Sequence, residues 1–233
     1  AGDGDTLVIT ATDDIALVPT VAGIETVTFN LNASTTPAAT ATVFNIAADN
    51  ITTDKIVIDV TKLGSTVTTT NITAVKTDTI IETDLGLTVA GVANADLTIN
   101  ATSTTSQTIA NVTGTVDTLA INGSSATLLT LSDAAAEEAV TVINTGAVTI
   151  SALSGNTTTD ATTLDVTAGG AVSITSANKG SIVATTSSGN IALVDGDAAT
   201  GAVTLTAEAG NVKVTTADAS TGTLTVNASG NIT

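Results

Sequence analysis

Six amino-acid types that carry much of protein chemistry are absent from this chain: cysteine, histidine, methionine, tryptophan, tyrosine and arginine. Without histidine, no side chain has an unperturbed pKa near neutrality, and without cysteine there is neither a thiolate nucleophile nor a disulfide. Catalysis would have to rely on carboxylates and hydroxyls. A carbohydrate-active enzyme, which needs paired carboxylates together with aromatic platforms and basic partners, is therefore the least favoured function, and we expect no catalytic residues.

The balance of charge excludes a second group of functions. The 233 residues include 22 acidic and 5 basic side chains, for a net charge of -17. The basic residues are Lys55, Lys62, Lys76, Lys179 and Lys213. A chain with so few cations is not expected to bind nucleic acid or an anionic membrane. No apolar run approaches the roughly 20 residues of a membrane helix, so we expect no membrane span.

A repeated phrase is the strongest positive signal. Gly-Asn-apolar phrases start at Gly189, Gly210 and Gly230, and related Gly-x-apolar phrases start at Gly180, Gly201 and Gly222. Both series have a spacing of about 21 residues, and each phrase leads into a short apolar/polar alternation, the period of a half-buried strand. One period therefore holds two strands and two corners. This pattern predicts an all-β fold, a right-handed parallel β-helix (β-solenoid) with coils of about 20 residues.

Tandem β-sandwich domains are the alternative, since short strands with frequent turns also build sandwiches. The solenoid is favoured because the corner residues recur at every second strand, and because Phe29 and Phe44 are the only aromatics in a Val/Ile/Leu-rich chain. Residues 118–233 form the regular part, continuous with an irregular β-repeat region in residues 1–117. One segment, "SDAAAEEAV" (Ser132–Val140), predicts a single helical turn capped by Ser132.

The alternation also assigns side chains to the inside or the outside of the coil. We expect one continuous interior lined by Val203, Leu205, Val212, Val214, Leu224 and Val226, with Ile182, Val203 and Leu224 stacked in a column. The corner glycines are expected to adopt positive φ angles. The asparagines of the Gly-Asn phrases are expected to share amide hydrogen bonds from coil to coil.

Candidate metal ligands are few. "AGDGD" places Asp3 and Asp5 beside glycines, and "DGD" does the same for Asp195 and Asp197. Carboxylates and carbonyls are the oxygen ligands that calcium prefers, so these four residues are calcium candidates, with solvated acidic loops as the alternative. The adjacent pair Asp13 and Asp14 is a weaker candidate.

Asn-x-Ser/Thr sequons are frequent, at Asn50, Asn71, Asn111, Asn122 and Asn156 among others. They are informative about glycosylation only if the source organism glycosylates its surface proteins. Because Thr and Ser are so common in this chain, we interpret these asparagines as polar ladders on the outer faces of strands.

The phrases "DTLVITATDD", "GIETVTFNLNA" and "DTLAINGSSATLLTLS" resemble the Thr/Ala/Val-rich β-repeats of bacterial surface-layer (S-layer) proteins and of large RTX-linked secreted adhesins. "AGDGD" resembles the Gly/Asp calcium turns of RTX proteins, and the C-terminal phrases are similar to coils of filamentous-haemagglutinin-type adhesins. The resemblance implies an extracellular structural protein that self-assembles at the cell surface into a lattice, sheath or filament. It also implies a cell-surface polysaccharide as a further partner. A β-solenoid stalk of a secreted adhesin is the alternative.

Assembly of so acidic a chain is expected to depend on calcium, because copies repel each other unless divalent cations bridge them. The final "GNIT" opens a coil that is not completed, so we expect an open strand edge there to serve as a contact surface.

Overall fold

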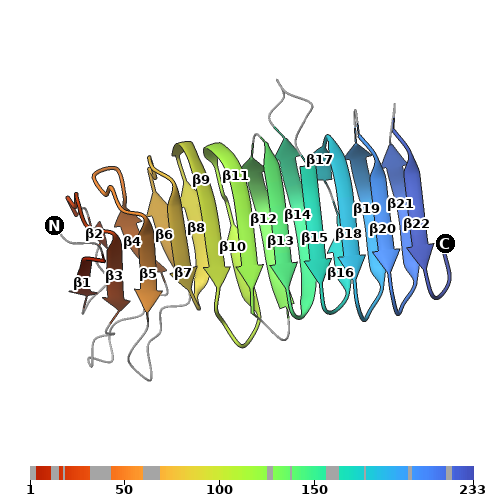
Figure 1. Cartoon of the computed structure of the whole chain (residues 1–233), viewed down its shortest axis with the longest axis horizontal. Coiled ribbons are helices and arrows are strands. Elements are labelled where there is room, and N and C mark those ends of the chain that lie inside the picture. Colours follow the sequence, from red (N-terminus) through yellow and green to blue (C-terminus); the bar gives the residue numbers. More distant parts are fainter. Residues whose placement is uncertain are drawn as a thin grey trace.

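The computed structural model describes residues 4–11, 16–17, 19–31, 43–59, 69–124, 128–136, 138–155, 163–175, 177–198, 201–218 and 222–233. The secondary structure of these segments is entirely β. None of the described residues belongs to a helix that could span a lipid bilayer. The strands form two eleven-stranded sheets, here called sheet A and sheet B, that run side by side along the long axis of the molecule (Figure 1).

Sheet A contains β1 (Thr6–Ala11), β3 (Thr26–Leu31), β5 (Lys55–Asp59), β7 (Thr79–Thr83), β9 (Val92–Ala101), β11 (Gly114–Gly123), β13 (Ala139–Asn144), β15 (Thr163–Ala168), β18 (Ser181–Thr186), β20 (Val203–Ala207) and β22 (Leu224–Ala228). Sheet B contains β2 (Ala16–Leu17), β4 (Val43–Ala47), β6 (Thr69–Thr73), β8 (Gly86–Ala90), β10 (Gln107–Ala110), β12 (Leu128–Ala136), β14 (Ala147–Gly155), β16 (Val172–Ile174), β17 (Ala177–Lys179), β19 (Ile191–Ala198) and β21 (Val212–Asp218). Successive strands alternate between the sheets, and β16 and β17 together act as one interrupted strand of sheet B, because both pair with β14 and β19.

The parallel pairing confirms the predicted β-solenoid. β20 pairs in parallel with β18 and β22, while its sequence neighbour β21 pairs with β19 in the other sheet. A sandwich would pair β20 with β21 in a hairpin, so the sandwich alternative was wrong.

Coil length explains why one half of the sequence looks regular and the other does not. Val183 pairs with Thr204, and Thr204 with Thr225, so each of these coils spans 21 residues. Near the N-terminus, Thr26 pairs with Lys55, 29 residues later. The sheets are nevertheless continuous, and the step from residue 117 to residue 118 lies inside β11.

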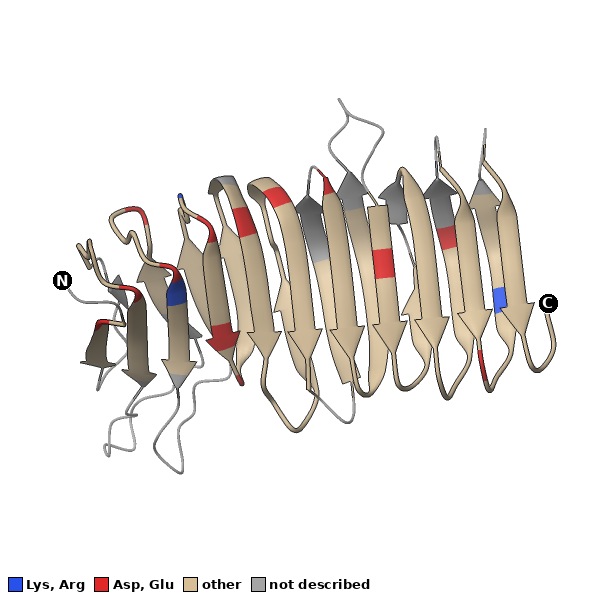
Figure 2. Ribbon diagram, viewed as in Figure 1, with Lys and Arg blue, Asp and Glu red and all other residues tan. Residues whose placement is uncertain are grey.

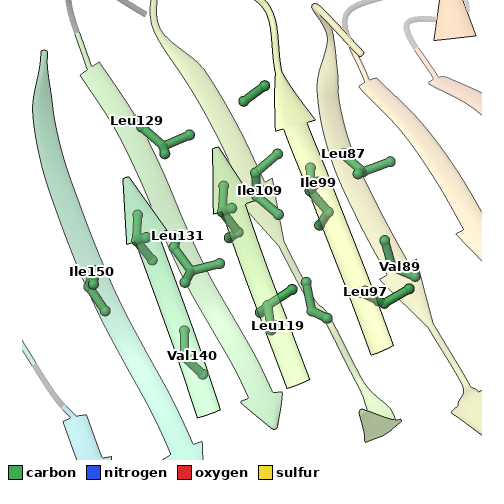
Figure 3. Packing of buried hydrophobic residues seen from close by; sticks show 14 of the residues in the cluster. Leu87, Val89, Leu97, Ile99, Ile109, Leu119, Leu129, Leu131, Val140 and Ile150 are labelled. Atoms are coloured by element: carbon green, nitrogen blue, oxygen red, sulfur yellow. The ribbon is translucent and has the colours of Figure 1, made fainter. Parts of the chain in front are cut away.

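A ladder of apolar side chains fills the space between the sheets. In sheet A, one inward column runs through every strand: Leu7, Val27, Ile56, Ile81, Ile99, Ile121, Val142, Val166, Ala184, Leu205 and Val226. Figure 3 shows Leu87, Ile109, Leu131 and Ile150 of sheet B pointing into the same interior. Each fully buried Val, Leu or Ile side chain contributes about 1.5–3 kcal/mol, which makes this ladder the main stabilising element.

The predicted inward register is confirmed. Val203, Leu205 and Val212 are fully buried, and Ile182, Val203 and Leu224 pair in one column. Leu224 is 49% exposed, because its strand has a neighbouring strand of sheet A on one side only.

The helical turn expected at Ser132–Val140 was wrong. Ser132 and the alanines after it belong to β12, and Ala134 pairs with Leu153 of β14. Alanine and glutamate favour helix in isolation, but at this position the backbone completes a ladder with the next coil, and that tertiary pairing outweighs intrinsic propensity.

The corner glycines are required for a different reason from the one expected. Gly189 has a φ of 149°, but Gly201, Gly210, Gly222 and Gly230 do not have positive φ. A Cβ on Gly201 would instead lie 1.6 Å from the carbonyl oxygen of Gly180 in the preceding coil. These glycines therefore allow the backbones of successive coils to touch at the corners.

Candidate functional site

One acidic residue directly precedes the inward-facing apolar alternation of sheet A in each of seven successive coils, before the strand or, in β9 and β11, within it. This acidic corner consists of Asp5, Glu25, Asp54, Asp78, Asp96, Asp117 and Glu138. The strand registers bring these residues to the same or an adjacent position in neighbouring strands, although they are 18 to 29 positions apart in sequence. Figure 2 shows them as a row of red segments along one edge of the sheet.

Three carboxylates of the acidic corner, those of Glu25, Asp78 and Asp96, bind the backbone of neighbouring coils. The Asp78 carboxylate accepts the Asp96 N–H at 3.0 Å, and the Asp96 carboxylate accepts the N–H and the hydroxyl of Thr118 at 3.1 and 2.7 Å. Glu25 accepts the Asp5 N–H at 2.9 Å. These contacts satisfy donors at a corner where the strand ladder is not yet regular, so the acidic corner has a structural role.

Beyond the acidic corner, glycine takes over the same position. After one coil in which this position falls on Thr162, outside the described residues, the column that contains Asp117 and Glu138 continues through Gly180, Gly201 and Gly222. The corner is thus built in two ways, by carboxylate caps in the first half of the rod and by direct backbone contact in the second.

An open pocket of about 250 Å³ lies against the acidic corner. Its lining includes Glu25, Asp54 and Thr53, with Gly23, Ile24, Thr52 and Thr77. The Thr53 hydroxyl donates to the backbone oxygen of Glu25 at 2.9 Å and is therefore already engaged within the protein. The nearby Lys55 forms an ion pair with Glu82. The pocket thus presents carboxylates and hydroxyls, which suit a cation or a hydroxylated molecule.

The structure does not bring the predicted calcium candidates together. Asp5 belongs to the acidic corner, whereas Asp195 is exposed on β19 near the other end of the rod (Figure 1). The backbone of Asp197 pairs with that of Asp218. Asp3, Asp13 and Asp14 lie outside the described residues, as does the side chain of Asp197. Among the side chains that are described, no group of three or more acidic residues is placed to hold a metal ion, and calcium at these positions stays a prediction.

The expected asparagine ladder is present. Asn211 donates its backbone N–H and its Nδ2 to Asn190 Oδ1 at 2.9 and 3.3 Å. The Asn231 N–H donates to Asn211 Oδ1 at 2.7 Å. Each amide oxygen thus ties one coil to the next.

Two further asparagine ladders lie where the sequence has no fixed period. Asn71 Nδ2 donates to Asn45 Oδ1 at 2.9 Å, and Asn122 Nδ2 donates to Asn100 Oδ1 at 3.1 Å. The sequons at Asn71 and Asn122 are therefore ladder positions, as interpreted. Asn111 instead lies exposed at a corner with a φ of 51°.

The remaining sequons of that group lie elsewhere. Asn50 lies in a turn, where its amide donates to the carboxylate of Asp49 at 3.2 Å. Asn156 lies outside the described residues.

The outer face of sheet B contrasts with the acidic corner. In the first part of each strand, the outward residues are small and mostly hydroxylated, and we call this surface the neutral face; the exposed Asp195 of β19 lies at its border. It includes Asn45, Asn71, Thr88, Thr108, Ala110, Thr130, Ser132, Thr149, Ser151, Ser173, Ala192, Val194, Lys213 and Thr215. This set contains one charged residue, Lys213, and no carboxylate.

Family models, curated protein sequences and solved structures give no match to this chain. The function is therefore inferred from the features of the molecule itself.

Proposed function

We propose that the protein is an extracellular structural component that self-assembles at the cell surface into a lattice, sheath or filament. The observation that carries this proposal is the shape of the molecule: a rod with two long parallel sheets, covered on their inner faces and open on their outer faces (Figure 1). Each coil contacts mainly its neighbours, so the rod behaves as a stiff stack of similar units. A stiff rod of this kind is suited to be the subunit of an assembly in which the same contact surface is used repeatedly.

Charge makes the proposed assembly sensitive to ions. Adjacent strands of sheet A are about 4.8 Å apart, less than the Debye length of about 8 Å at physiological ionic strength, so the carboxylates of neighbouring coils add up to one line of negative charge along the rod. Two copies therefore repel each other unless cations gather at the corner. Calcium acts in this proposal as a neutralising counter-ion along the row of carboxylates.

Light scattering as calcium is added and then chelated tests the proposal, with electron microscopy of the same samples. The expected result is growth from monomers to ordered assemblies with calcium, reversed by the chelator. A chain that stays monomeric at every calcium and protein concentration would contradict self-assembly. The stalk of a secreted adhesin would then be favoured, because a rod of this length also holds a binding tip away from the cell.

A charge variant sharpens the test. Asp117→Asn with Glu138→Gln removes two carboxylates from the acidic corner and should lower the calcium concentration needed for assembly. Asp165→Asn with Glu208→Gln makes the same change in net charge outside that corner. If both variants shift the calcium requirement equally, net charge and not the acidic corner controls assembly.

A further inference from the structure

We propose that the neutral face is the surface through which two copies of this chain dock laterally, sheet B against sheet B. This inference rests on the proposed self-assembly and names the contact surface for it.

Charge selects this face over the other. The outer face of sheet A carries Lys55, Glu82 and Asp165, and the acidic corner runs along its entrance (Figure 2). In a two-fold contact the same patch meets itself, so carboxylates of sheet A would come close to their own copies. The described side chains of the neutral face give a chain of net charge -17 a long surface without carboxylates, bordered by Asp195, on which two copies can meet.

The side chains of this face are suited to a close approach of two sheets. Thr108, Thr130, Thr149 and Ser173 form one outward column by strand register. None of the described hydrogen bonds uses their hydroxyls, so these groups can bond across an interface. Short side chains with a methyl and a hydroxyl allow sheets to pack face to face at about 10 Å and to pair their polar groups.

The area of the neutral face predicts that a contact between two copies is weak by itself and that many such contacts in one assembly are strong together. From β4 to β21 the face spans nine strands of sheet B, about 40 Å at the usual strand spacing. A strip about four residues wide buries roughly 600 Å² per copy, at the lower end of specific interfaces. A single pair should therefore dissociate readily, while many such contacts in one lattice hold together through multivalency.

Because the chain has no cysteine, any disulfide formed by a variant with one engineered cysteine reports a contact between two copies at that position. Thr130→Cys lies on the neutral face, and Thr141→Cys lies on the outer face of sheet A with similar partial exposure. Under mild oxidation in assembling conditions, Thr130→Cys should form disulfide-linked dimers at least tenfold faster than Thr141→Cys. Circular dichroism of both variants checks that the β-solenoid is intact.

A second pair of variants tests the energetics of the same contact. Thr149→Asp puts a carboxylate in the neutral face and should raise the protein concentration needed for assembly at least tenfold. Thr204→Asp, on the outer face of sheet A, should change it by less than twofold.

The outcomes separate the two proposals. If the wild-type chain never assembles, self-assembly and its contact face both fail. If it assembles but Thr141→Cys cross-links as fast as Thr130→Cys, only the assignment of the face is overturned. If Thr149→Asp weakens retention on immobilised cell-surface polysaccharide while assembly is unchanged, the neutral face binds glycan and not a second copy.

Discussion

Replacement of Gly210 by alanine should destabilise the protein, although the φ angle of this residue lies outside the left-handed region that favours glycine. At such positions alanine usually stabilises by about 0.4–1 kcal/mol, because it restricts the unfolded chain. In this solenoid a Cβ on Gly210 would lie 1.9 Å from the carbonyl oxygen of Gly189. The sign of the effect therefore separates a steric role of the glycine from a conformational one.

The magnitude follows from the displacement that the new methyl group requires. Ordinary contact begins near 3.4 Å, so the two coils must separate by about 1.5 Å at this corner. This separation would break two hydrogen bonds beside the corner, each 2.9 Å long. The Ile191 N–H donates to the backbone oxygen of Asn211, and the Asn211 N–H donates to Asn190 Oδ1. At about 1–1.5 kcal/mol each, less the gain in the unfolded state, the expected loss is about 2 kcal/mol.

Urea denaturation followed by circular dichroism measures this loss, since the chain has no tryptophan or tyrosine for fluorescence. The midpoint should fall by about 1 M for a loss of this size. Gly23 supplies the matched control, because its φ is +70° and a Cβ there meets nothing within 4 Å. Gly23→Asn should cost less than Gly23→Ala, since asparagine tolerates a left-handed backbone, whereas Gly210→Asn should be at least as harmful as Gly210→Ala. An unchanged or raised midpoint for Gly210→Ala would refute the steric explanation.

Three further predictions concern the interior and the ladders. Val203→Asp should cost more than 4 kcal/mol because it buries an unpaired charge, while Thr204→Asp on the outer face should cost less than 1 kcal/mol; equal melting temperatures would contradict the register. Gln107→Leu should cost about 3 kcal/mol by calorimetry, since the buried amide makes three hydrogen bonds at a corner, and a neutral result would mean that water replaces them. Asn211→Ala should cost about 2 kcal/mol because it removes the Nδ2 bond to Asn190 and the acceptor of the Asn231 N–H, and hydrogen exchange should locate the lost protection at Asn231; uniform loss along the rod would argue against a local ladder.

The β-solenoid and its inward register could be predicted because the last coils keep a constant length. With a fixed step of 21 residues, equivalent residues such as Val203 and Leu224 fall in one column of the sequence. The reason for the corner glycines could not be predicted in the same way. A clash such as that between a Cβ on Gly201 and the oxygen of Gly180 depends on how closely two coils approach, which local sequence does not encode.

The acidic corner was missed because its residues are unequally spaced along the chain. The segments that separate Glu25 from Asp54 and Asp78 from Asp96 differ in length, so a search at constant period does not align them. A different signal was available: each of these residues directly precedes an apolar/polar alternation such as "TVTF" or "KIVI". Aligning strands with one another, and not coils of fixed length, would have placed the carboxylates in one row.

The change of corner type, from carboxylates before residue 139 to glycines from residue 180 onward, makes the distribution of charge along the rod uneven. Like charges in neighbouring coils repel each other and weaken the contacts between the coils of the first half. Added salt weakens this repulsion, because it shortens the distance over which charges interact. Among the described residues of the glycine half, no carboxylates stack at the corresponding corner. In a stack whose units hold one another only through nearest neighbours, unfolding starts at the weakest interface and spreads from it. The end of the rod at which unfolding begins should therefore depend on the ionic strength.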